Sequence, residues 1–362
     1  MSILIGILSI VFAFGLVIFV HELGHFIAAK KIGVRVDRFS FGLGPEICGF
    51  QWGETRYCLA WIPLGGEVRM AGDDTDEQQT SDQMVGKTPR EFFGQPWYRR
   101  IPIVLAGPAM NYVSAVLIFT GIALMWGEPR ISPEPVIGAV VPGYPAQKAG
   151  LTEKDRILSV NGQPVREWVQ LAEQIHKMPE QDVTLEYQRD GADVRRVVVR
   201  PQKEKSTGVG MIGIQPDTVA VRVGLLKSLG RGVELTVGWS YFTVRYLAEK
   251  IVRREKPELS GPIGIASVVA KAAKAGAQDF WNLLGLLSVG IGLFNLFPIP
   301  MLDGGHVVFY LWEGLSRRPL RRKMLAIANS VGLSILLAIL LFATVSDIRR
   351  LRAEKSAASQ AQ

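Results

Sequence analysis

Two histidines and a glutamate lie close together near the start of the chain, in the segment His21-Glu22-Leu-Gly-His25. On a helix, side chains four positions apart project from the same face, so His21 and His25 can reach one metal ion. Imidazole nitrogen suits Zn2+, and a carboxylate beside the metal can take a proton from water. This spacing predicts a catalytic zinc site with Glu22 as the general base.

The surroundings of this segment strengthen the prediction. Residues 3–20 form an uncharged apolar run, so the three ionisable side chains lie inside or at the end of a membrane helix. Ionisable groups at membrane depth cost roughly 2.5–3.5 kcal/mol each on insertion scales, and by default they indicate function. A cleaved signal peptide is the alternative, but the run lacks a basic start and a small-residue cleavage site.

A catalytic zinc site usually has three protein ligands, and two histidines leave it one short. Asp303 follows a later apolar run, in the segment Asn295-Leu-Phe-Pro-Ile-Pro-Met-Leu-Asp303-Gly-Gly-His306. If the first and third apolar runs cross the membrane in the same direction, Asp303 lies in the same leaflet as the histidines. His306 is the competing ligand. We favour Asp303 and expect His306 to be a helix-start residue hydrogen-bonded to its neighbours.

Apolar residues gather in four blocks, each approaching the roughly 20 residues that a bilayer demands. We therefore expect a polytopic α-helical membrane protein with about four transmembrane helices, one inserted small α+β domain and a membrane-associated β-hairpin. The expected parts are the first transmembrane helix (1–30), a cytoplasmic loop with the hairpin (31–100), the second transmembrane helix (101–126), the small domain (135–203), an interfacial amphipathic segment (204–277), the third transmembrane helix (278–300), the LDGG segment with a cytoplasmic loop (301–323), the fourth transmembrane helix (324–346) and a tail (347–362).

Basic residues predict the orientation, because Lys and Arg are enriched in cytoplasmic loops. Clusters at 30–38 and 317–323 place both of these loops in the cytoplasm and residues 127–281 on the outer side. The basic tail at 349–355 disagrees with this orientation. The amphiphilic stretch 222–252 is expected to lie along the membrane interface. If it crossed the membrane, the parity of the topology would fail.

Residues 135–203 have the pattern of a small domain. A tight-turn signal at 160–163 follows a strand-like run, apolar residues at 168, 171, 172 and 175 follow the helical period, and 183–187 alternate as a strand. The segment 143–165 resembles the PDZ domains of bacterial envelope proteases. That resemblance implies a groove that accepts an extended peptide as an added strand. A structural spacer that binds nothing is the alternative.

HELGH, the PDZ-like insert and the segment NLFPIPMLDGG at 295–305 together resemble the site-2 protease family, including the bacterial regulator-of-sigma-E proteases. The resemblance covers nearly the whole chain, although many members have two PDZ domains and this chain has room for one. It implies Zn2+ as the cofactor, with His21, His25 and Asp303 as ligands and Glu22 as the general base. It also implies that Asn295 holds the substrate or the developing oxyanion. The remaining residues to which we assign substrate binding are Gly42, Gly44 and Pro45 of a GxGP-like loop, Gly65, Gly66, Pro298 and Pro300. The segment 106–111 resembles the second-span motif of the family.

Residues 57–70 are expected to form an apolar hairpin around a turn at Pro63 and Gly65. The family resemblance implies that this hairpin dips into the membrane, where its edge pairs with an unwound substrate as an added strand. An ordinary cytoplasmic hairpin is the alternative.

We expect an intramembrane zinc metalloendopeptidase that cuts single-pass membrane proteins. The resemblance suggests anti-sigma factors or remnant signal peptides as substrates. The expected location is a bacterial cytoplasmic membrane, with the active site toward the cytoplasmic leaflet and lipid as a further partner. The net charge of +8 does not indicate nucleic-acid binding, because the basic residues are scattered or flank apolar blocks.

Two other classes of function compete with a protease. A transporter would use intramembrane His, Glu and Asp to relay protons, but the spans are few and no internal repeat is present. A catalytically silent adaptor would act through the PDZ groove, but it would have lost one of the four site residues. The identity of the substrate and the oligomeric state are left open by the sequence.

Overall fold

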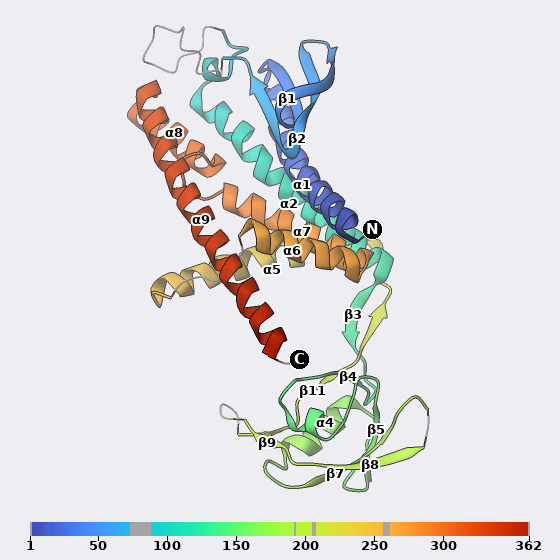
Figure 1. Cartoon of the computed structure of the whole chain (residues 1–362). Helices are drawn as coiled ribbons and strands as arrows, with labels where there is room; N and C mark the ends of the chain where they lie inside the picture. The colour runs from blue at the N-terminus through green and yellow to red at the C-terminus, as the bar shows by residue number, and fades with distance from the viewer. Residues whose placement is uncertain (1, 73–87, 192, 205–207, 256–260, 361–362) are drawn as a thin grey trace. The chain divides into compact units, whose positions relative to one another are not determined.

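The computed structural model describes residues 2–72, 88–191, 193–204, 208–255 and 261–360. The chain divides into two compact units, which are described separately. The first unit comprises residues 1–123 and 224–362, and the second, residues 124–223, is inserted into it along the chain (Figure 1).

Four helices in the described part of the first unit are long and apolar enough to cross a membrane, judged by length and composition. They are α1 (Ser2–Ile32), α2 (Trp97–Trp126), α7 (Ala277–Asn295) and α9 (Arg322–Gln360). The predicted number of apolar helices is thus confirmed. The predicted tail is not separate, because α9 continues to Gln360 through a segment rich in the helix formers Ala, Glu, Lys and Arg. Residues 361–362 lie outside the described part.

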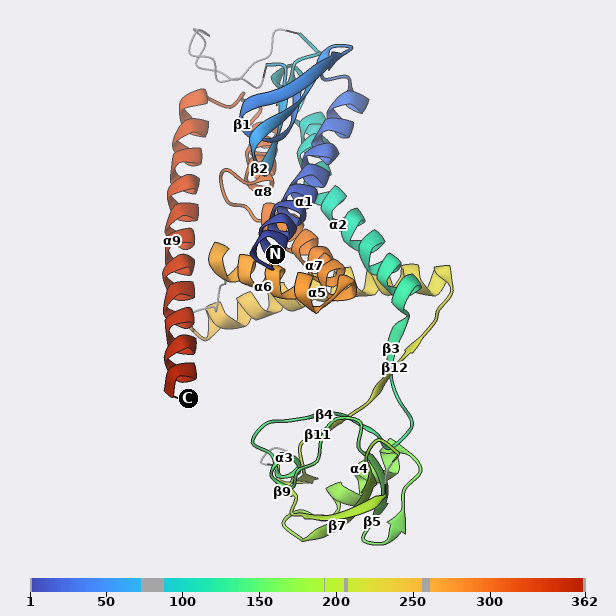
Figure 2. The ribbon, with the colours of Figure 1, turned by 45° about the vertical axis from the view of Figure 1, so that its right-hand side comes forward.

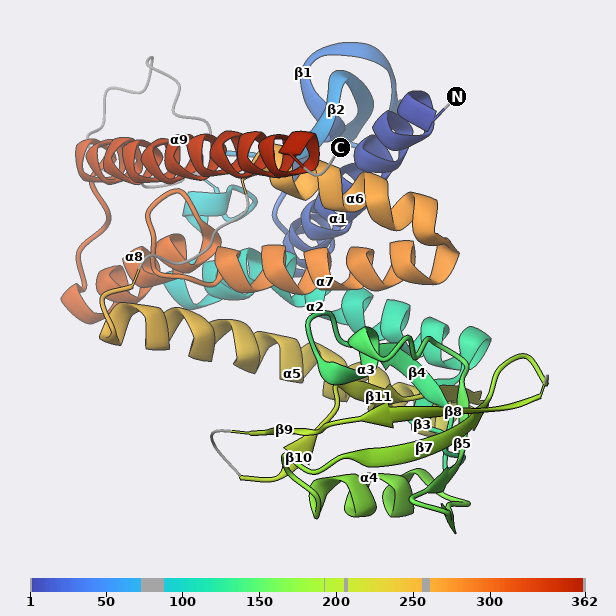
Figure 3. The same ribbon diagram turned by 60° about the horizontal axis from the view of Figure 1, so that its bottom comes forward.

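Helix α6 (Pro262–Ala275) and α7 form a helical hairpin that turns at Gly276, where φ is +144° (Figure 3). The hairpin packs against α1 through a small apolar core. Ala13 and Val17 of α1 are buried there against Val269 of α6 and Leu284 of α7. This core holds the first half of α1 in place.

The third apolar helix ends at Asn295 rather than at 300, and a further helix, α8 (Asp303–Ser316), follows where a loop was predicted. Proline has no N–H and restricts the residue before it, so Pro298 and Pro300 stop α7. The turn is compact: a Cβ at Gly304 would lie 2.3 Å from the Leu296 carbonyl oxygen. Asp303 therefore occupies the first position of a helix.

A two-stranded sheet lies beside the second half of α1 (Figures 1 and 2). It consists of β1 (Val36–Trp52) and β2 (Thr55–Met70), joined by a tight turn at Gly53. The predicted hairpin within 57–70 is wrong in its pairing, because both of its arms belong to β2 and pair with β1 rather than with each other. The chain does reverse in this segment, since residues 56–59 run in the same direction as 38–41 of β1, whereas 66–69 run antiparallel to them. β1 bends as well, at Gly42 and Gly44, where φ is +96° and +91°. The early part of β1 thus lies between the two arms of β2, and Phe41 pairs with both Leu59 and Gly66.

Helix α5 (Leu225–Val252) has a buried face of small residues and an exposed face with apolar side chains, and its location at the membrane interface stays a prediction. Its small residues Ser228, Gly232 and Thr236 are buried, and a Cβ at Gly232 would lie 2.4 Å from Thr120 Oγ1 of α2. Leu226 and Val237, on a second face, are exposed. The rest of 204–277 differs from the prediction, since it also contains strands of the second unit and α6.

The second unit contains a four-stranded sheet in the order β6-β5-β7-β8, together with α4 (Trp168–His176) and the short α3 (Pro145–Lys148) (Figure 2). Leu171 and Ile175 of α4 are buried in its core. The strands of this sheet are β5 (Arg156–Val160), β6 (Gln163–Pro164), β7 (Val183–Gln188) and β8 (Val194–Val199).

The second unit extends beyond the predicted boundary at 203. Strand β4 (Ile137–Val140) needs a hydrogen-bonding partner, and it finds one in β11 (Ile214–Pro216). Ile212, just before β11, belongs to the same core. The remaining strands are β3 (Glu128–Ile131) paired with β12 (Thr218–Val221), and β9 (Gln202–Lys203) paired with β10 (Gly210–Met211).

Asp155 is a buried charge in the second unit. Its carboxylate accepts hydrogen bonds of 2.7 and 2.8 Å from Arg189 and one of 2.8 Å from the Thr152 N–H. Burial raises the pKa of Asp155, but the hydrogen bonds from Arg189 and Thr152 outweigh burial and hold the pKa below its usual value.

We expect Asp155→Asn to destabilise the second unit by about 1.5–3 kcal/mol, the range for hydrogen bonds to charged groups. Because the folded-state pKa is depressed, this stabilisation is present above the ordinary pKa of about 3.9 and is lost as the pH falls through the folded-state value. Hydrogen exchange of residues 124–223 in the full chain measures the effect, with the exposed Asp182→Asn as the control. Equal protection in the two variants would contradict the prediction.

Candidate metal centre

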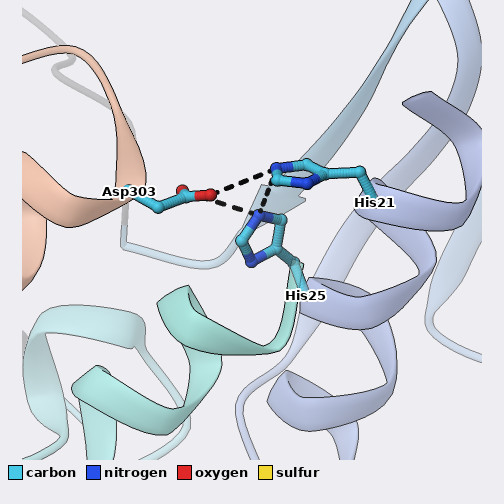
Figure 4. A group of neighbouring side chains, drawn as sticks. All are labelled: His21, His25 and Asp303. Atoms are coloured by element: carbon cyan, nitrogen blue, oxygen red, sulfur yellow. Dashed lines mark hydrogen bonds and ion pairs between the residues drawn. The ribbon is translucent and has the colours of Figure 1, made fainter. Parts of the chain in front are cut away.

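The side chains of His21 and His25, from α1, meet that of Asp303, from the start of α8 (Figure 4). His21 Nε2 lies 3.1 Å from Asp303 Oδ2, and His25 Nε2 lies 3.6 Å from Asp303 Oδ1. The two Nε2 atoms are 3.2 Å apart. The structure therefore brings together the three residues that the sequence singled out as metal ligands.

This donor set fits a zinc ion. Zinc–nitrogen and zinc–oxygen bonds of about 2.0–2.1 Å place the ligand atoms of a tetrahedral site roughly 3.3 Å apart. The observed separations are 3.1, 3.2 and 3.6 Å. Asp303 Oδ2 is buried, and no hydrogen-bond donor in the described part of the chain satisfies it. Three protein ligands leave the fourth position of a tetrahedral site open, as catalytic zinc requires.

Helix α2 packs against both imidazole rings. His25 Nδ1 lies 2.9 Å from the Ile103 carbonyl oxygen, which accepts its proton and leaves Nε2 free to bind a metal. A Cβ at Gly107 would lie 2.3 Å from His25 Nε2 and 2.9 Å from His21 Cε1. Gly24 of α1 allows this approach, because a Cβ there would lie 2.1 Å from the Ala106 carbonyl oxygen.

Asn111 is a partner of His21 that the sequence reasoning placed only within a motif. Its Nδ2 lies 3.2 Å from His21 Nδ1, while its Oδ1 is buried with no partner among the described residues. A half-turn of the amide exchanges the two atoms and places Oδ1 at the His21 Nδ1–H. That arrangement pairs Asn111 Oδ1 with the His21 Nδ1–H and leaves His21 Nε2 free for a metal. The signal that could have found Asn111 is its spacing from Gly107, four positions along the same helix face.

Glu22 lies between the histidines and the sheet. It is half-buried, and a Cβ at Gly66 would lie 2.6 Å from its Cγ, so β2 passes directly against it. Gly65 and Gly42 also mark close approaches. A Cβ at Gly65 would lie 2.5 Å from Leu43, and one at Gly42 would lie 2.8 Å from the Ile62 carbonyl oxygen. Gly44 and Pro45 are exposed at the bend of β1, and no described contact joins them to the three ligand side chains.

Asn295 is the last residue of α7, and its Nδ2 donates a 3.0 Å hydrogen bond to the Ile291 carbonyl oxygen of its own helix. No described hydrogen bond joins it to the ligand cluster. Pro298 is exposed, and Pro300 packs against α9, where a Cβ at Gly332 would lie 2.3 Å from its carbonyl oxygen. The substrate-binding roles of these residues remain predictions.

His306 is not part of the three-residue cluster found among the described residues. Its ring stacks on Tyr310 at 6.2 Å with an interplanar angle of 28°, and its backbone N–H donates to the Leu302 carbonyl oxygen. It is therefore a first-turn helix residue, as expected, but only its backbone makes the expected hydrogen bond, because Nδ1 of the ring is buried with no partner among the described residues.

Comparison with known proteins places these features in a family context. Residues 9–339 match the sequence profile of peptidase family M50. A protein of Rhizobium meliloti (strain 1021) whose name assigns it as a zinc metalloprotease is 34% identical over 94% of this chain and 95% of its own length. The zinc metalloprotease RasP of Bacillus licheniformis is 28% identical over 95% of this chain and 99% of its own.

Two further similarities are informative to different degrees. The regulator of sigma-W protease RasP of Bacillus subtilis is 27% identical over 95% of this chain and 98% of its own. Among solved structures, the PDZ domain of an SdrC-like protein from Listeria monocytogenes matches 24% of this chain and 90% of its own, with 18% identity and a TM-score of 0.22. A likeness this weak does not support a functional assignment.

Proposed function

Because this chain belongs to peptidase family M50 and is a zinc metalloprotease with Zn2+ as its cofactor, we propose that it cuts single-pass membrane proteins within their membrane-spanning segments. One observation carries the proposal. His21 and His25 lie on an apolar helix that is long enough to span a membrane. Their ligand atoms and that of Asp303 all lie within 4.8 Å of one another. Such a site is expected to meet its substrates in the bilayer.

In this proposal His21, His25 and Asp303 hold the zinc, and Glu22 is the general base. Bound Zn2+ supplies Lewis acidity, which polarises the scissile carbonyl and acidifies the attacking water. Glu22 takes the proton from that water and delivers it to the nitrogen of the leaving amine. Asn295 donates to the developing oxyanion, which requires its Nδ2 to exchange the Ile291 carbonyl oxygen for the substrate.

The strand β2 is the proposed docking edge for the substrate. A peptide bond in a membrane helix must be unwound before it is cut, and its freed backbone groups then need new hydrogen-bond partners. Pairing along β2 supplies them beside Glu22, because Gly66 has no side chain to block the approach. The exposed Trp61 and Ile62 support insertion of this edge into the membrane. Gly42, Gly44 and Pro45 lie at the bend of β1 beside this edge. We propose that they and the two prolines after α7, Pro298 and Pro300, contact the substrate.

The substrate class is inferred from a relative. The Bacillus subtilis protein is named a regulator of sigma-W protease, so the proposed substrates are anti-sigma-factor-like proteins in general rather than those of sigma-E alone, with remnant signal peptides as the alternative. We place the chain in a bacterial cytoplasmic membrane, with the site toward the cytoplasmic leaflet and the second unit outside. A groove of about 150 Å³ between α4 and β10–β11, lined by Leu171, Ile175 and Ile214, is the proposed peptide site of that unit.

The test uses the purified full chain in detergent and a labelled single-pass substrate whose membrane span contains helix-destabilising residues. We expect cleavage inside the span, loss of cleavage with a zinc chelator, and recovery when Zn2+ is returned. Mass spectrometry of the products locates the cut. Cleavage that occurs only outside the span, or that survives the chelator, would overturn the proposal.

Asn111 offers a test of the support behind His21. We expect Asn111→Leu to weaken zinc binding about 10–100-fold, because metal-bound histidines depend on the partner of their second nitrogen. Asn111→Asp is the control, since its carboxylate can still accept from His21 Nδ1–H. Chelator competition measures both affinities. Wild-type affinity in Asn111→Leu would show that His21 needs no such partner.

A further inference from the structure

Arg100 is a buried arginine in the first turn of α2 for which the roles above give no reason. Its side chain is only 2% exposed. The guanidinium carbon lies 5.3 Å from the ring centre of Phe93 and 4.7 Å from that of Tyr310, and Nη2 pairs with Glu313. A planar guanidinium both stacks and pairs in a defined direction. Arg100 therefore joins α2 to α8, which carries Tyr310 and Glu313.

The residues of α8 that contact Arg100 lie on the same face of the helix as Asp303. Asp303, His306, Tyr310 and Glu313 are separated by three, four and three positions, which is the spacing of one helix face. The His306 ring stacks on the Tyr310 ring within this row. With a rise of 1.5 Å per residue, Glu313 lies about 15 Å along the helix from Asp303. Any rotation of α8 that moves Asp303 also moves Glu313 away from Arg100.

One face of α2 contacts both parts of the metal centre. Arg100, Ile103, Gly107 and Asn111 are separated by three, four and four positions. The last three of these residues lie against the imidazole rings of His25 and His21. The first contacts the helix that supplies the carboxylate. The same face of α2 therefore contacts both the histidines of α1 and the helix α8 that carries the aspartate.

We propose that Arg100 is a positioning residue, which fixes the rotation of α8 against α2 and thereby the place of Asp303 relative to His21 and His25. The proposal rests on the ligand roles proposed above. Arg100 Nε and Nη1 have no hydrogen-bond partner among the described residues, so Glu313 supplies the described counter-charge. Separating the buried guanidinium from its part-buried counter-charge is unfavourable, and the pair therefore resists rotation of α8.

The decisive variant replaces the ion pair with apolar side chains of similar volume, as Arg100→Met combined with Glu313→Leu. Such replacements often preserve folding, so packing survives while the directional link is lost. The readouts are the zinc dissociation constant of the full chain in detergent, by chelator competition, and the visible absorption spectrum with Co2+ in place of zinc, which reports ligand geometry. We expect wild-type thermal unfolding, zinc binding at least about 10-fold weaker and an altered Co2+ spectrum.

The matched control is Arg99→Met, which removes the exposed neighbouring arginine and should leave both readouts unchanged. Wild-type affinity and an unchanged spectrum in the folded double variant would overturn the positioning role. If the double variant does not fold, Arg100→Lys decides, because it retains the charge but lacks the planar, stacked fork. Weaker zinc binding there supports the proposal, and wild-type behaviour overturns it. Failure of the wild-type chain to bind zinc would instead refute the proposed ligand set.

Discussion

Glu22→Gln is expected to lower the rate of peptide-bond cleavage by about 10²–10⁴-fold, the contribution of a positioned general base. Glutamine has the same shape as glutamate but cannot take the proton of the attacking water. Zinc binding should be nearly unchanged, because the three donor atoms of the cluster come from His21, His25 and Asp303. Single-turnover cleavage of a membrane-spanning substrate and zinc stoichiometry, measured on the same preparation, check the two expectations.

The control for this variant is Glu67→Gln. Glu67 lies on β2 next to Gly66, and its Oε1 pairs with Arg69 Nη2 at 3.0 Å, so its charge is already engaged. We expect this control to cleave at close to the wild-type rate. Cleavage by Glu22→Gln at the wild-type rate would remove Glu22 from the mechanism. Loss of zinc together with activity would show that Glu22 supports the metal rather than the proton transfer.

Gly107→Ala is expected to impair zinc binding and, with it, cleavage. The added Cβ would lie 2.3 Å from His25 Nε2, which is the atom that faces Asp303. The ring cannot swing aside freely, because its Nδ1 is held by the Ile103 carbonyl oxygen at 2.9 Å. We expect zinc affinity to fall by at least about 10–100-fold, the range seen when the support of a metal ligand is lost. Chelator competition on the full chain measures the change.

Gly121→Ala is the matched control, since it makes the same substitution in the same helix. A Cβ at Gly121 meets no described atom within 4 Å. Alanine favours a helix by about 1 kcal/mol over glycine, so neither substitution should weaken α2 itself. The control should bind zinc as the wild type does. If Gly107→Ala did so too, the close approach of α2 to the imidazoles would not be needed for the site.

The chemistry of the first helix could be predicted from sequence because it is local. His21 and His25 share a helix face because they are four positions apart. The apolar run before them shows that this helix can enter a membrane. The apolar helices were recognisable for the same reason, since hydropathy is summed over neighbouring residues. Asp303 was a sound choice because the prolines and glycines around it mark a break between helices.

The sheet beside α1 shows where local signals mislead. Pro63 and Gly65 suggest a turn, and Gly42 and Gly44 suggest one equally well. The chain reverses near both pairs, but the arms on either side of Pro63 do not pair with each other, because residues near Phe41 lie between Leu59 and Gly66. The boundary of the second unit was missed for a similar reason: the partner of β4 lies beyond residue 210. Pairings over such distances leave no periodic trace in a short window.

The sequence alone determined which residues can bind a metal and which segments can enter a membrane, since both depend on residue type and short spacing. Tertiary structure decided what surrounds the ligands. Asn111 reaches His21 across 90 positions of the chain, and the Ile103 carbonyl reaches His25 across 78. Arg100 reaches Glu313 across 213. These partners meet only because α2 packs against both α1 and α8, and close packing at Gly24 and Gly107 sets the distances to the imidazole rings.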